Sequence, residues 1–397
     1  MKITEITNGI HYVGVNDRCK YKFENLWPLP YGVSYNAYLI TDKKNVLIDT
    51  VDAAYTDRLL DNIAEIIGDG KIDYLIINHM EPDHSASIQF IRQKYPQMTI
   101  VGNVKTLEMV KGYYGIDDNT LCIKNGESLS IGKRTLTFHL TPMVHWPETM
   151  MTYVNEDKLI FSGDAFGCFG TLDGGITDSQ LNTDKYWSEM VRYYSNIVGK
   201  YGSPVQKALQ KLGGLPITSI CSTHGPVWTE NIAKVIGIYD RLSRYDADEG
   251  VVIAYGSMYG NTEQMAEAIA EELSAQGVKN IVMHNVTKSH PSYIIADIFR
   301  YKGLIIGSPT YSNQIFPEVE ALLSKILLRE VKGRYLGYFG SFTWAGAAVK
   351  RLAEFAEKSK FELVGDPVEM KQAMKDLTYT QCENLARAMA DRLKKDR

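Results

Sequence analysis

The chain has 397 residues, more than one hydrophobic core usually supports, so two domains are expected. Its 43 basic and 47 acidic residues give a net charge of −4, which offers no electrostatic reason to expect nucleic acid or anionic lipid as a partner. Five scattered cysteines without a C-x-x-C pair predict neither a disulfide framework nor a cysteine metal site. Because an apolar leader and runs of ~20 apolar residues are absent, we expect a cytoplasmic protein with no membrane segment.

From the start to about residue 240, short apolar runs typical of strands alternate with helical patterns, which indicates a layered α/β domain. The predicted strands include residues 36–40, 45–48, 74–77 and 99–101, and the predicted helices include residues 54–67 and 88–94. The polar, charged segment 241–250 is interpreted as the connection between two domains.

The rest of the chain follows a regular β-α-β series, which predicts a doubly wound parallel sheet. We expect strands at residues 251–255, 281–286, 303–307, 335–340 and 362–365. We expect helices at residues 262–276, 317–328, about 346–358 and 378–394.

The most specific local motif is His79-Met80-Glu81-Pro82-Asp83-His84, which directly follows an apolar run. Three more candidate ligands, His145, Asp164 and His224, also follow apolar runs, and strand ends of α/β sheets gather at one site. Carboxylates crowded near imidazoles would be costly to bury without a cation, so these seven side chains predict a metal site. The other histidines are interpreted as structural, hydrogen-bonded residues: His11, His139, His284 and His290.

A second constellation lies in the C-terminal half. Residues 255–262 read Y-G-S-M-Y-G-N-T between a predicted strand and a predicted helix, where N–H groups and hydroxyls are suited to hold a phosphate, although a capped turn is the alternative. The loops 308–313 and 341–346 mix aromatic and small polar residues, as a flavin ring requires. This ordered set of three loops resembles flavodoxin, which implies FMN as the ligand.

The predicted FMN-binding residues come from these three loops. Tyr311 and Trp344 are the candidates for stacking on the ring or contacting its edge, and simple packing is the alternative for each. The full set is Ser257, Met258, Tyr259, Gly260, Asn261, Thr262, Pro309, Thr310, Tyr311, Asn313, Ser341, Phe342, Trp344, Ala345 and Gly346.

The motif H-x-E-x-D-H with a distant His, Asp and His, followed by the flavin loops, resembles the flavodiiron proteins over essentially the whole chain. The resemblance implies a metallo-β-lactamase-like αββα sandwich at residues 1–248 and a flavodoxin-like doubly wound sheet at residues 249–397. It also implies two irons with a bridging oxo or hydroxo group. One iron would be bound by His79, Glu81 and His145, the other by Asp83, His84 and His224, with Asp164 between them; in some relatives the histidine matching His84 does not coordinate.

The same resemblance implies an activity and partners. The enzyme would reduce dioxygen to water, nitric oxide to nitrous oxide, or both. FMN would relay electrons from rubredoxin or another external donor, and two chains would form a head-to-tail homodimer. The sequence does not distinguish the two gases, because both would use the same metal ligands.

Glu81 gives a separate reason to expect iron rather than zinc. Hydrolytic relatives carry a histidine at this position, whereas a hard oxygen ligand favours an oxidisable metal. The positive charge of two divalent ions would be balanced by the negative charges of Glu81, Asp83, Asp164 and a bridging hydroxide. One added charge at about 4 Å and an effective dielectric of about 20 is worth roughly 4 kcal/mol, enough to shift a metal potential.

Two other functions fit parts of the sequence. A zinc-dependent metallo-β-lactamase-type hydrolase with a flavodoxin-like appendage would use a metal-bound hydroxide, and Glu81 argues against it. A non-catalytic electron carrier would use only the flavin domain and would not need seven metal ligands.

Overall fold

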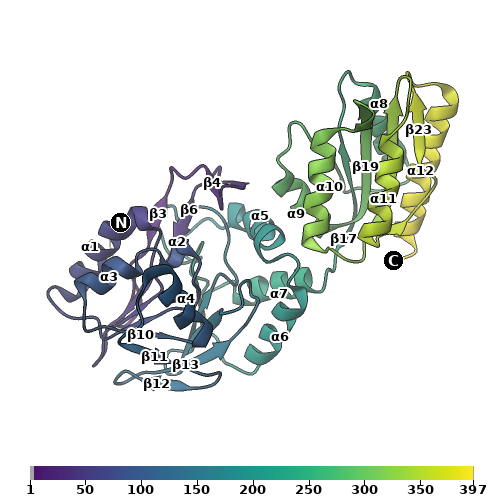
Figure 1. The fold of residues 1–397 in the computed structure, drawn as a ribbon. Helices are drawn as coiled ribbons and strands as arrows, with labels where there is room; N and C mark the ends of the chain where they lie inside the picture. The colour runs from purple at the N-terminus through teal and green to yellow at the C-terminus, as the bar shows by residue number, and fades with distance from the viewer. Residues whose placement is uncertain (1–3, 397) are drawn as a thin grey trace. The chain divides into compact units, whose positions relative to one another are not determined.

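The computed structural model describes residues 4–396, and the chain divides into two compact units, Met1–Asp240 and Arg241–Arg397. In both units helices flank β-sheets (Figure 1). The connection expected at 241–250 is shorter, because helix α7 (Ile232–Ser243) runs into it and strand β17 (Asp248–Tyr255) begins within it. Its charged residues form surface ion pairs instead, such as the one between Arg241 and Asp248. Within residues 4–396, no helix is both long and apolar enough to span a bilayer.

The N-terminal unit is built on two sheets. The first has the order β1-β2-β7-β8-β9-β10-β11 and the second the order β12-β13-β14-β15-β16. Side chains from both sheets, including Tyr38, Ile48, Phe138 and Phe161, form one buried cluster between them. The strands of the first sheet are β1 (Thr4–Thr7), β2 (Ile10–Tyr12), β7 (Tyr38–Ile40), β8 (Val46–Ile48), β9 (Tyr74–Ile76), β10 (Thr99–Gly102) and β11 (Thr120–Cys122). Those of the second are β12 (Ser128–Ser130), β13 (Thr135–Leu140), β14 (Met150–Val154), β15 (Leu159–Gly163) and β16 (Ser219–Ser222).

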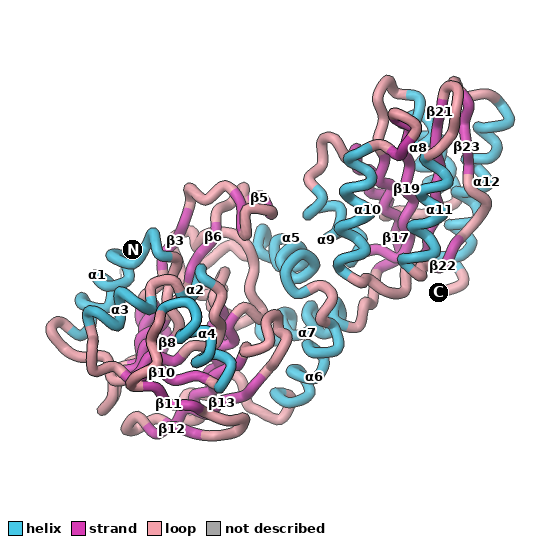
Figure 2. Tube along the Cα trace, in the orientation of Figure 1, coloured by secondary structure: helices cyan, strands magenta, loops and turns pink. Residues whose placement is uncertain are grey.

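Helices cover the outer face of each sheet, which gives the predicted αββα sandwich (Figures 1 and 2). Those beside the first sheet are α1 (Thr56–Ile67), α2 (Pro82–Ser85), α3 (Ile88–Lys94) and α4 (Val104–Tyr114). Those beside the second are α5 (Asp184–Tyr193), the π-helix η2 (Tyr194–Val198), α6 (Gly202–Leu212) and α7. Two short ribbons complete the unit: β3 (Val15–Asp17) with β6 (Val33–Tyr35), and β4 (Lys22–Phe23) with β5 (Trp27–Pro28).

The C-terminal unit has a parallel sheet of order β18-β17-β19-β21-β22, with β23 also parallel to β21. Helix α8 packs against α12 on one face, and α9, α10 and α11 cover the other (Figure 2). This arrangement confirms the predicted flavodoxin-like doubly wound sheet. The remaining strands are β18 (Ile281–Asn285), β19 (Tyr301–Tyr311), the antiparallel β20 (Gln314–Ile315), β21 (Tyr335–Phe342), β22 (Glu362–Leu363) and β23 (Val368–Lys371). The helices are α8 (Asn261–Ala275), α9 (Pro291–Arg300), α10 (Pro317–Arg329), α11 (Ala348–Ser359) and α12 (Asp376–Lys394).

Candidate functional site: a two-metal pocket and a flavin pocket

The seven predicted metal ligands lie at the carboxyl ends of strands or in the segments that follow them. Each is at most 9% exposed. His79 and Glu81 follow β9, and helix α2 carries the next two ligands, with Pro82 at its first position, where a missing N–H costs nothing. The other positions are the β13–β14 loop for His145, the end of β15 for Asp164 and the end of β16 for His224.

Four of these residues form the His79 cluster: His79, Glu81, His145 and Asp164. Nε2 of His145 lies 3.1 Å from Oε2 of Glu81 and 3.0 Å from Oδ2 of Asp164. Nε2 of His79 lies 3.3 Å from Oε2 of Glu81 and 3.6 Å from Oδ2 of Asp164. Two imidazole nitrogens and two carboxylate oxygens therefore face one point.

The other three form the Asp83 cluster: Asp83, His84 and His224. Oδ2 of Asp83 lies 3.4 Å from Nε2 of His84 and 3.3 Å from Nε2 of His224. Oδ1 of Asp164 lies 3.1 Å from Nε2 of His84, so this carboxylate presents one oxygen to each cluster. Asp164 thus lies between the two clusters and contacts a histidine of each.

The donor set fits two cations. Nε2 of His84 and Nε2 of His224 lie 3.0 Å apart, and both carboxylate oxygens of Asp83 are buried with no hydrogen-bond partner within residues 4–396. Leaving such groups unpaired in a pocket is costly. Ligands bonded to one ion at about 2.0–2.2 Å lie roughly 3 Å apart, which is the spacing observed here.

Metal binding is expected to tighten as the pH rises from about 6 to about 9. Burial opposes a charge on these rings, but Asp83 and Asp164 raise the pKa of His84 to about 9, and Asp164 and Glu81 raise the pKa of His145 to about 9. Below that pH the metal-free imidazoles hold protons that an incoming ion must displace, and each proton displaced changes the affinity about tenfold per pH unit. Competition with a chromophoric chelator at several pH values measures this slope, and a constant affinity would contradict it.

Several groups around the ligands were not foreseen from the sequence. Oε1 of Glu148 lies 2.8 Å from Nδ1 of His79, and the carbonyl oxygen of Ser34 lies 2.8 Å from Nδ1 of His224. The hydroxyl of Thr223 donates to Asp164. The buried hydroxyl of Tyr193 lacks a hydrogen-bond partner within residues 4–396, and burial together with the charges of Asp164, Glu81 and Asp83 raises its pKa. Glu148, three positions after His145, and Thr223, directly before His224, lie near predicted ligands in the sequence, whereas Ser34 and Tyr193 do not.

The second pocket lies in the C-terminal unit and has a volume of about 380 Å³. It is lined by every predicted flavin residue except Gly260 and Gly346, and also by Ser312, Thr343 and Gln372. Gly260 precedes α8 with a φ of 91°, which favours glycine. A Cβ on Gly346 would lie 2.5 Å from a carboxylate oxygen of Glu369, so this glycine allows close packing.

The three loops of this pocket are tied together. The hydroxyls of Thr262 and Ser341 are 2.8 Å apart, and Oγ1 of Thr310 accepts from the N–H of Ala347 at 3.0 Å. Among residues 4–396, no charged side chain lines the pocket, so a phosphate there depends on N–H groups and hydroxyls.

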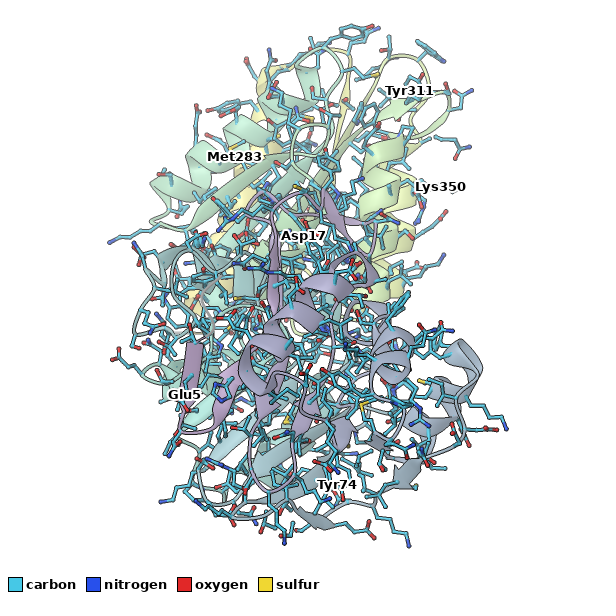
Figure 3. All side chains as sticks on the ribbon, turned by 90° about the vertical axis from the view of Figure 1, so that its left-hand side faces the viewer. Glu5, Asp17, Tyr74, Met283, Tyr311 and Lys350 are labelled. Carbon is cyan, nitrogen blue, oxygen red and sulfur yellow. The ribbon has the colours of Figure 1, made fainter. Side chains whose placement is uncertain are left out.

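The aromatic residues of the flavin pocket lie at its rim. Tyr259 is 92% exposed and Trp344 is 81% exposed, so both rings are free to cover a ligand. The half-exposed Tyr311 projects from the end of β19 (Figure 3). A planar ring with apolar faces suits these side chains.

A two-metal pocket and a flavin-type pocket on these two folds define a class of two-domain redox enzymes. The model of the "ODP family beta lactamase" matches residues 33–225, and the Flavodoxin model matches residues 253–384. The nitric oxide reductase of Moorella thermoacetica is 33% identical over 98% of each chain. Rubredoxin oxygen:oxidoreductase from Desulfovibrio gigas superposes with a TM-score of 0.96, at 32% identity over 99% of each chain. The flavodiiron protein from Giardia intestinalis superposes with a TM-score of 0.93, at 28% identity over 100% of this chain and 98% of that one.

This chain belongs to the flavodiiron protein family, and it is an oxidoreductase. The family expected from the sequence is therefore confirmed, and the hydrolase alternative is the less supported one.

Proposed function

We propose that this protein reduces dioxygen to water, nitric oxide to nitrous oxide, or both, at a di-iron centre, with electrons relayed by FMN. The observation that carries the proposal is the pair of buried ligand clusters that share Asp164. His79, Glu81 and His145 would hold one iron, and Asp83, His84 and His224 the other. Two irons so held supply reducing equivalents and Lewis acidity to a small oxidant.

We assign the metal domain to residues 1–248 and the FMN domain to residues 249–397, and we place the enzyme in the cytoplasm. The relatives named above support both gases as substrates, since one is called a nitric oxide reductase and another a rubredoxin oxygen:oxidoreductase. The second name also supports rubredoxin as the electron donor. The pocket lined by Ser257 to Thr262 and the two later loops would hold FMN.

Anaerobic reduction of the purified enzyme, followed by separate exposure to each gas, tests the proposal. We expect at least one gas to reoxidise the flavin and to give water or nitrous oxide as the product. Metal analysis of freshly isolated protein is the control for the hydrolase alternative. Two zinc ions without iron, or a flavin that neither gas reoxidises, would overturn the proposal.

We also propose a head-to-tail dimer in which the flavin of one chain lies beside the irons of the other, as a closed two-fold assembly. Exposed aromatic side chains support it, because Tyr259 and Trp344 at the flavin pocket, and Tyr21 and Tyr31 of the metal domain, offer apolar surface to a partner. Analytical ultracentrifugation is expected to show a dimer or a multiple of it. A monomer with full activity would refute this arrangement.

A further inference from the structure

The imidazole of His79 contacts the carboxylate of Glu148 through Nδ1, the ring nitrogen that does not face the other ligands of the His79 cluster. Nδ1 of His79 and the backbone N–H of Met80, at 2.8 and 2.9 Å, both point to Oε1 of Glu148. Because a backbone N–H can only donate, Oε1 is an acceptor, and Nδ1 of His79 carries the hydrogen of the other contact. Nε2 of His79, which faces Glu81 and Asp164, is therefore the nitrogen left to bind a metal.

Within residues 4–396, no carboxylate is hydrogen-bonded to Nδ1 of either histidine in the Asp83 cluster. Nδ1 of His224 lies 2.8 Å from the carbonyl oxygen of Ser34, which is neutral. Nδ1 of His84 is buried and has no hydrogen-bond partner in the described part of the chain. The two clusters thus have different surroundings although their ligands are alike.

The position of Glu148 is itself fixed by its neighbours. Its side chain is 0% exposed, and its second oxygen is buried without a hydrogen-bond partner among residues 4–396. Nδ2 of Asn103 donates to the carbonyl of Glu148 at 2.5 Å, while Oδ1 of Asn103 caps helix α4 by accepting from the N–H of Lys105. A carboxylate with one unpaired oxygen is costly to bury, so a positive charge nearby is needed to offset it.

We propose that Glu148 is a positioning residue that holds the metal-binding tautomer of His79 and favours tight binding and oxidation of the metal in the His79 cluster over that in the Asp83 cluster. The inference rests on the proposed two-metal function. An imidazole that donates to a carboxylate is a more basic ligand, and a nearby negative charge favours the more highly charged ion.

Titration with ferrous iron tests the proposal in the full-length protein, after removal of metal and under anaerobic conditions. Glu148→Gln keeps an oxygen acceptor and removes the charge. It is made in two backgrounds: His224→Ala, which leaves the His79 cluster intact, and His145→Ala, which leaves the Asp83 cluster intact. We expect iron affinity to fall about 10–100-fold in the first background and to stay unchanged in the second.

An equal loss of iron affinity in both backgrounds, or no loss of iron affinity in either, would overturn the role of Glu148 while leaving the proposed function intact. Failure of the unmodified chain to take up two ferrous ions would overturn the two-metal site, and this inference with it. The two failures are therefore distinguishable.

A second variant and a second readout guard against a general folding defect. Asn103→Ser keeps a capping side chain for α4, but serine is too short to hold the carbonyl of Glu148. In the His224→Ala background we therefore expect Asn103→Ser to lower iron affinity, by less than Glu148→Gln does. In a redox titration of the iron-loaded protein followed by paramagnetic resonance, Glu148→Gln is expected to raise the potential at which the first iron is oxidised. An unchanged potential, with unchanged far-ultraviolet dichroism, would overturn the electrostatic role.

Discussion

Replacing Asp164 with asparagine is expected to abolish binding of two irons and reduction of either gas, while FMN stays bound. Asp164 places one oxygen 3.0 Å from Nε2 of His145 and the other 3.1 Å from Nε2 of His84. Asparagine has a similar shape but a single oxygen and no charge, so it cannot serve both clusters. Loss of a residue that only hydrogen-bonds to a metal ligand lowers metal affinity or activity about 10–100-fold. Because Asp164 contacts both clusters itself, its replacement is expected to lower iron affinity by more than about 100-fold.

Iron per chain, measured by mass spectrometry, and gas consumption by the reduced enzyme check this result. Asp57→Asn on the exposed face of α1 is the matched control, since it makes the same chemical change away from the pocket. An Asp164→Asn enzyme with full gas reduction would refute the assigned bridge. It would also revive the reading in which the chain is only a flavin electron carrier.

The helices and strands of both units could largely be predicted from the sequence, because the spacing of apolar residues shows which face of each element is buried. Residues 88–94 were expected to be helical and form α3, and the run at 74–77 forms β9 (Tyr74–Ile76). Helix α9 (Pro291–Arg300) was not predicted, since its apolar residues run almost directly into β19. Strand β23 (Val368–Lys371) was also missed, because four alternating residues are too short a signal.

The metal ligands could be predicted from the sequence, because histidine, aspartate and glutamate are the residue types that bind metals. The groups that contact those ligands from other parts of the fold could not be predicted. All seven predicted ligands fall into two adjacent clusters, because each lies in a segment that follows a strand. The carbonyl of Ser34, which contacts His224, has no side-chain signature, and any residue at that position would offer one. Gln372 reaches the flavin pocket only because the unpredicted strand β23 pairs with β21.

Replacing Arg334 with alanine is expected to destabilise the C-terminal unit by about 3–4 kcal/mol. Arg334 is 1% exposed, and burial lowers its pKa to about 10. Its guanidinium donates to the carbonyls of Ile298 at 2.6 Å and Phe299 at 2.8 Å, in the last turn of α9, where a cation also complements the helix dipole. It donates as well to the carbonyl of Tyr245, in the segment that leads into this unit, at 2.9 Å. Alanine would remove all of these hydrogen bonds from the buried carbonyls.

Urea unfolding followed by flavin fluorescence reports the release of flavin from the pocket of this unit, which matters because a two-domain chain does not unfold in a single step. Arg334→Lys is expected to lose less stability than Arg334→Ala, because lysine keeps the charge. It should still be less stable than the unmodified chain, because one nitrogen cannot reach both α9 and Tyr245. Arg300→Ala is the matched control: the side chain of Arg300 is 57% exposed and lies 3.9 Å from Asp248, so its loss is expected to change stability little. If Arg334→Ala unfolded within about 1 kcal/mol of the unmodified chain, water would have to satisfy the carbonyls, and Arg334 would not anchor the connecting segment.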